Sequence, residues 1–93
     1  RLLRIVEEKG KRFYPHFLGS SPGMAASAQL ASLTDDPHLE WDINPNPLRT
    51  SCFTEPFKGK DGFLSLSEEP GIGWEIRKEI LDKWAVVHVQ VSN

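Results

Sequence analysis

The chain has 93 residues, of which 39% are hydrophobic and 26% charged, and its formal net charge at pH 7 is −2. This size suits one small soluble domain with a modest core. The weak, scattered charge argues against a nucleic-acid partner or an anionic membrane surface. No apolar run approaches the roughly 20 residues of a membrane span. The single cysteine, Cys52, has no disulfide partner within the chain, so a reducing, cytoplasmic location is expected.

The first half of the chain alternates between helical and extended patterns. Residues 1–10 space apolar side chains at helical intervals and end on Gly10, which predicts the tail of a helix. Residues 11–17 are aromatic and rich in strand formers, and a Gly-Ser-Ser-Pro turn follows them. A helix of small residues is then predicted over about 23–33. Hydrophobic and polar residues alternate in 38–44, which predicts a second strand.

The second half is more irregular. A proline-punctuated loop covers 45–56, and Asp61-Gly62 between two extended runs predicts a hairpin turn. A turn and a short amphipathic helix are expected near 70–81. The chain closes on a predicted strand with period 2, whose apolar face would carry Val87, Val89 and Val91.

The order strand, helix, strand within residues 11–44 is a βαβ rhythm. It implies two parallel strands joined by a crossover helix. Two such strands alone leave both edges open and one face uncovered, so a unit of this kind is normally a slice of a larger α/β sheet or barrel. The chain also starts at Arg1 without an initiator methionine. We therefore expect a fragment of a larger α/β fold.

The residues with the best placement for chemistry lie at the ends of these two strands. His16 closes the first strand, and Glu40, Asp42 and Asn44 form the polar face of the second. In α/β barrels such positions are functional, since an imidazole can move a proton near neutral pH and a shielded carboxyl group can donate to developing negative charge. On an isolated sheet the same face would simply contact water. The residue pattern alone leaves both interpretations open.

The remaining reactive side chains give weaker signals. His38 follows Asp36-Pro37 in a turn, His88 lies on the polar face of the last predicted strand, and Cys52 has no base near it in sequence. None of these residues has the spacing of a Cys-x-x-Cys or His-x-x-x-His ligand pair. No metal site is therefore predicted within the chain.

Three stretches together resemble a known family. They are FYPHFLGSSPGMAASAQLAS, PHLEWDINPNPLR and EPGIGWEI, and they cover most of residues 13–81. They resemble the C-terminal end of the barrel domain in the enolase superfamily, in the mandelate racemase/muconate lactonizing branch. The resemblance implies that residues 1–93 are the C-terminal portion of a (β/α)7β TIM-like barrel. The capping domain and the earlier barrel strands would lie outside this chain.

The resemblance also implies a function. Enzymes of this kind bind Mg²⁺ and remove the proton next to a substrate carboxylate, here as an acid-sugar dehydratase or a racemase/epimerase. The match assigns the role of general base to His16. To Glu40 it assigns a hydrogen bond to the substrate carboxylate as charge builds on it. Asp42 and Asn44 share the face of Glu40 and are expected to contact substrate, although no motif assigns them a role. The metal ligands and a second base would come from earlier strands, so the isolated chain should be inactive.

The expected partners follow from this assignment. They are a hydroxy-acid or sugar-acid substrate, the rest of the same polypeptide, and further copies of the intact enzyme in a homo-oligomer. Two alternatives stay open. One is a small non-catalytic α+β interaction module, and the other is a muconate lactonizing-type member that uses lysine bases. His16 in its Pro-His-Phe context argues against the second.

Overall fold

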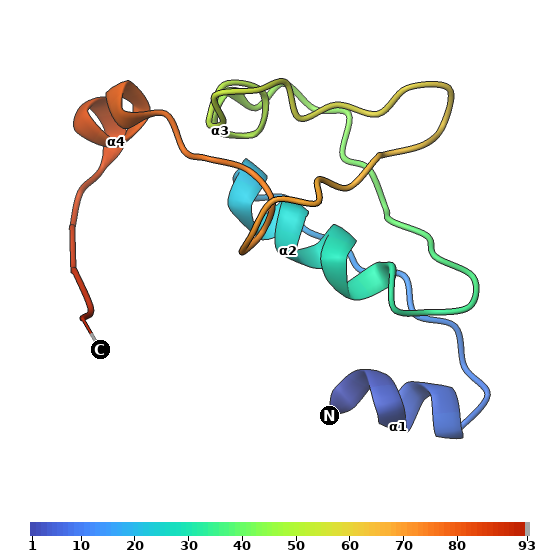
Figure 1. The fold of residues 1–93 in the computed structure, drawn as a ribbon. Coiled ribbons are helices and arrows are strands. Elements are labelled where there is room, and N and C mark those ends of the chain that lie inside the picture. Colours follow the sequence, from blue (N-terminus) through green and yellow to red (C-terminus); the bar gives the residue numbers. More distant parts are fainter. Residues whose placement is uncertain (93) are drawn as a thin grey trace.

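The computed structural model describes residues 1–92, and within that range the regular elements are four helices (Figure 1). They are α1 (Leu2–Glu8), α2 (Ser21–Ala31), α3 (Pro47–Thr50) and α4 (Lys78–Trp84). The same range forms no strand. It contains three isolated β-bridges, which join His16 with Glu40, Phe53 with Ile76, and Lys60 with Phe63. None of the described helices has the length and hydropathy needed to cross a membrane.

Of the predicted βαβ unit, the two expected strands are reduced to a single β-bridge. The bridge between His16 and Glu40 is parallel, and α2 connects the two segments along the chain. The expected direction of the two segments is thus confirmed, while the two strands themselves are not formed. Two strands without further strands beside them are only marginally stable, and Pro15 has no N–H to donate to a ladder.

Helix α2 is the element that the rest of the chain packs against. Ser20 precedes it in an extended conformation and Pro22 occupies its first turn, as the Gly-Ser-Ser-Pro sequence predicted. The helix is displaced by two residues from the predicted range 23–33. Its buried residues are Ser21, Met24, Ala25, Ala28 and Ala31. Because most of them are small, neighbouring segments can lie close to the helix axis.

The core is a small aromatic cluster laid over α2. Met24 and Ala25 of the helix pack with Phe53 and Phe57, and Trp74 joins them from a later turn. The rings of Phe57 and Trp74 meet edge to face with centroids 5.0 Å apart, and those of Phe53 and Trp74 stack at 5.8 Å. The irregular segment 51–76 therefore folds back across α2 (Figure 1).

Helix α1 and the turn at Asp61-Gly62, which were predicted from local sequence signals, are both present in the structure. Helix α1 ends in a Schellman motif, in which Gly10 has φ 58° and Lys11 N donates to the Val6 carbonyl at 3.0 Å. At the predicted hairpin turn, Asp61 and Gly62 have φ values of 53° and 81°, and Lys60 and Phe63 exchange backbone hydrogen bonds. This is the geometry of a type I′ turn.

The closing strand was predicted wrongly. Helix α4 runs to Trp84, beyond the expected end of that helix, and the residues from 85 to 92 follow it without regular structure. Ala85 N donates to the Leu81 carbonyl at the end of α4, at 2.9 Å, and residues 86–92 form no backbone hydrogen bond with another segment. The valines of this tail are therefore largely exposed: Val86 96%, Val87 77%, Val89 75% and Val91 86%. Period-2 alternation can produce a strand only where a sheet edge receives it.

Candidate active site

His16 and Glu40 lie side by side. Nδ1 of His16 is 3.1 Å from Oε1 of Glu40, and the N–H of Glu40 donates to the Pro15 carbonyl at 3.1 Å. The parallel bridge therefore brings together the two residues that the resemblance marks as catalytic. Both side chains are partly open to solvent, 45% for the imidazole and 61% for the carboxyl group. Both groups are thus accessible at the surface of this chain.

The residues around His16 hold the chain close to α2. The ring of Phe17 lies against Gly19 and Gly23, where any added Cβ would collide with it. The two glycines thus leave room for this ring at the start of α2. On the other side of His16, the Tyr14 ring packs at 5.1 Å from His38. The aromatic residues on both sides of His16 in sequence, Tyr14 and Phe17, thus each contact another part of the chain.

Asp42 and Asn44 are engaged by the protein itself. Oδ2 of Asp42 is 2.6 Å from Nη1 of Arg49, and both side chains are nearly buried, with exposures of 8% and 5%. Oδ1 of Asp42 accepts from the backbone N–H of Asn44 at 3.0 Å and from its Nδ2 at 2.7 Å. The N–H of Asn44 and then the Arg49 guanidinium lower the pKa of Asp42. Substrate contact by Asp42 and Asn44 stays a prediction, and the contacts present stabilise their loop.

Sequence reasoning missed Arg49. Besides Asp42, its guanidinium donates to the carbonyl of Asn44, so it closes the loop that follows Glu40. The available signal was the Asn-Pro-Leu-Arg run within the motif PHLEWDINPNPLR. Nothing in that run indicates which carboxylate the arginine would meet.

The other candidates are poorly placed for chemistry. His38 is exposed, and its Nδ1 lies 3.3 Å from the carboxylate of Asp36. His88 lies in the exposed tail. Cys52 is buried, and this burial raises the pKa of its thiol, which disfavours the thiolate that a nucleophile needs. Across residues 1–92 no group of three His, Cys, Asp or Glu side chains could hold a metal ion. The described residues therefore do not fit a Mg²⁺ site by themselves.

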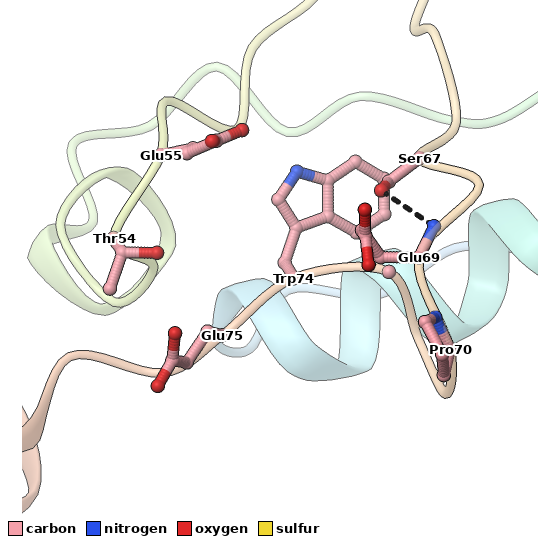
Figure 2. Close-up of a pocket in the computed structure, with 8 residues that line it drawn as sticks. Thr54, Glu55, Ser67, Glu69, Pro70, Trp74 and Glu75 are labelled. Carbon is pink, nitrogen blue, oxygen red and sulfur yellow. Dashed lines mark hydrogen bonds between the residues drawn. The ribbon is translucent and has the colours of Figure 1, made fainter.

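A cavity of about 490 Å³ lies away from these residues (Figure 2). Trp74 stands in its middle, with Glu55 and Glu75 on one side and Ser67 and Glu69 on the other. A hydrogen bond runs from the Glu69 N–H to the Ser67 hydroxyl, at 3.1 Å. The backbone N–H of Thr54 donates to the Glu75 carbonyl at 2.9 Å. The cavity contains none of the predicted site residues, and sequence analysis gave no sign of it beyond a turn.

Comparison with known proteins identifies the family. Residues 1–80 match the family described as Enolase C-terminal domain-like. The chain belongs to this family. The resemblance to the mandelate racemase/muconate lactonizing branch of the enolase superfamily is thereby confirmed.

Two curated relatives of this enolase-family chain are enzymes. D-galactarolactone cycloisomerase of Agrobacterium fabrum is 31% identical over 93 aligned residues, which cover 90% of this chain and 25% of the relative. Arabinonate dehydratase of Saccharolobus solfataricus is 24% identical over 80 residues, or 86% of this chain and 21% of the relative. The chain thus spans no more than a quarter of the length of either. No solved structure matches it significantly.

Proposed function

We propose that this chain is the C-terminal barrel segment of an enzyme that removes the proton α to the carboxylate of a hydroxy acid or sugar acid, as a dehydratase or an epimerase. The observation that carries the proposal is the contact of His16 with Glu40 at 3.1 Å across a parallel bridge. Family membership supports an enzyme over a small interaction module. The names of the two relatives, a cycloisomerase and a dehydratase, support a reaction on a sugar-acid derivative.

In this proposal the two side chains have complementary tasks. His16 accepts the α-proton, and the electron pair of the broken C–H bond moves towards the substrate carboxylate. Glu40, protonated, donates a hydrogen bond to the carboxylate oxygen on which charge develops. This role needs a shielded carboxyl group, and the 61% exposure of Glu40 in the chain alone leaves that shielding to the rest of the polypeptide.

Any Mg²⁺ ion would be bound by residues outside this chain. The family resemblance implies Mg²⁺, and its ligands would come from residues outside this chain, since the described residues offer no ligand group. The tasks proposed for His16 and Glu40 rest on the family resemblance and on the contact between the two side chains.

The base assignment is tested in the full-length enzyme with the variant His16→Asn. The substrate is first found by screening sugar acids for turnover, and exchange of the α-proton in D₂O is then followed by NMR. We expect loss of exchange by at least about 10²–10⁴-fold, the usual contribution of a positioned base, with the fold retained. His38→Asn is the matched control and should leave exchange near the wild-type rate, since His38 is exposed and its Nδ1 pairs with Asp36 rather than with His16 or Glu40. Wild-type exchange in His16→Asn would sink the assignment.

The role of Glu40 is tested with Glu40→Gln in the same enzyme. The amide still donates a hydrogen bond but lacks the acidity that strengthens the bond as charge develops. We expect kcat to fall by roughly 10²–10³-fold, as when an oxyanion-stabilising donor is lost, with a smaller effect on KM. A change confined to KM would instead make Glu40 a residue that binds the ground state.

A further inference from the structure

We propose that Arg49 is a positioning residue for the His16–Glu40 pair, a role that rests on the function proposed above. Within residues 1–92 a single backbone hydrogen bond, from Glu40 N to the Pro15 carbonyl, joins the two segments at the bridge. One bond cannot fix the offset between two side chains. Arg49 contacts the connections that leave both segments, and so adds a link to the bridge and to the ring contact of Tyr14 with His38.

The side chain of Arg49 holds the connection that follows Glu40. Its guanidinium is 2.6 Å from Oδ2 of Asp42 and also donates to the Asn44 carbonyl. Asp42 lies only two residues after Glu40, so holding Asp42 restricts the position of Glu40. The arginine is only 5% exposed, and its ion pair is therefore shielded from water and ions. A shielded pair keeps its geometry better than one on the surface.

The backbone around Arg49 holds the connection that follows His16. The hydroxyl of Ser21, which is fully buried, lies against the carbonyl oxygens of Leu48, at 3.0 Å, and Arg49. Asn46 adds two hydrogen bonds from its Nδ2 to the carbonyls of Leu18 and Gly19, at 3.1 and 3.0 Å. The start of α2 and the short helix α3 are thus bound to each other by side-chain to backbone contacts.

These contacts form one continuous path from base to acid. It runs from His16 through the turn to Ser21, across to Arg49, and through Asp42 back to Glu40. Loss of the guanidinium opens this path at its charged contact and leaves the Asp42 carboxylate without its cation. A displacement of about 1 Å at reacting groups can cost on the order of 10²-fold in rate. Arg49 touches neither His16 nor Glu40, so its effect is on their relative position.

The test uses the full-length enzyme and a double-mutant cycle. Arg49→Met retains the length of the side chain and removes its charge and donors. In the wild-type background we expect Arg49→Met to lower kcat by about 10²-fold and to leave KM within about threefold. In the Glu40→Gln background we expect it to lower kcat by less than about threefold, because the position of residue 40 then matters little. A residue needed only for folding would lower the active fraction by the same factor in both backgrounds. Equal factors, or no effect of Arg49→Met, would overturn the proposal.

Two further variants keep the test decisive. Arg77→Met, at an exposed arginine that precedes α4, is the matched control and should leave kcat unchanged. If Arg49→Met does not fold, Arg49→Lys takes its place in the same cycle, since it keeps a cation for Asp42 and loses the planar fork that also reaches Asn44. Full activity of His16→Asn and Glu40→Gln would overturn the proposed function itself. If both variants lose activity, but Arg49→Met lowers kcat by the same factor with and without Glu40→Gln, only the positioning role of Arg49 would be overturned.

Discussion

At the scale of single residues, Asp42 should make stability depend on pH in the acid range. Its pKa is lowered in the folded chain by the Asn44 N–H and the Arg49 guanidinium. Such a carboxyl group stabilises the fold at pH values above its unfolded pKa of about 3.9, and the contribution is lost as the pH falls through the lower, folded pKa. In the full-length protein, the advantage of wild type over Asp42→Asn in free energy of unfolding should therefore shrink on acidification.

Urea denaturation of both proteins at neutral pH and below the unfolded pKa measures this advantage. Asp82→Asn is the control, because Asp82 forms an exposed i,i+4 pair with Lys78 and such pairs contribute little. An advantage of wild type over Asp42→Asn that is the same at both pH values would show that the Asp42 contacts do not depend on its charge.

The sequence allowed some of these residues to be predicted and not others. The proximity of His16 and Glu40 was predicted because the βαβ rhythm required their segments to meet, and the resemblance singled out these two residues. Their catalytic roles stay a prediction. Arg49 was not found, because its partner is set by the path of an irregular, proline-rich loop. Charge pairs across such loops depend on backbone angles that have no repeating pattern in sequence.

At the scale of elements, the turn at Asp61-Gly62 gives a separate prediction. Gly62 has φ 81°, a conformation that L-residues with a Cβ adopt at a cost of about 1–2 kcal/mol. Gly62→Ala should therefore lower the free energy of unfolding of the full-length protein by about that amount, although no neighbouring atom would meet the new methyl group. Asp61→Asn is the control, since Asn also tolerates positive φ. Equal denaturation midpoints for Gly62→Ala and wild type would contradict this turn geometry.

The elements differ in how much of their structure is local. Helices α1 and α2 and the I′ turn form their hydrogen bonds within one segment, so their sequence signals placed them to within about two residues. Strands form theirs with other segments. The expected strands around His16 and Glu40 shrink to one bridge, and the valines after α4 have no partner, because the alternation in sequence specifies a face and not a neighbour.

At the scale of the whole molecule, the chain is more open than a self-contained domain. Its accessible surface is 7654 Å², whereas a compact monomer of this mass would expose about 5,400 Å². Its radius of gyration is 14.7 Å, against about 12 Å for a compact domain of this length. The buried core cluster has only four residues, Met24, Ala25, Phe53 and Phe57. This openness supports the proposal that the chain is a barrel segment.

The openness leads to a prediction for the isolated 93-residue chain. Large apolar side chains far apart in sequence are exposed, among them Leu33 69%, Ile43 89%, Phe63 79% and Val86 96%. Apolar surface of this extent is normally covered by another surface, so the isolated chain should self-associate and bind a dye such as ANS. Sedimentation velocity over a concentration series, with ANS fluorescence on the same samples, measures both effects. Val87→Lys combined with Val89→Lys should weaken association if the tail contributes to it. A monomer that does not bind ANS would show that the chain closes its own core and is not an incomplete piece of a barrel.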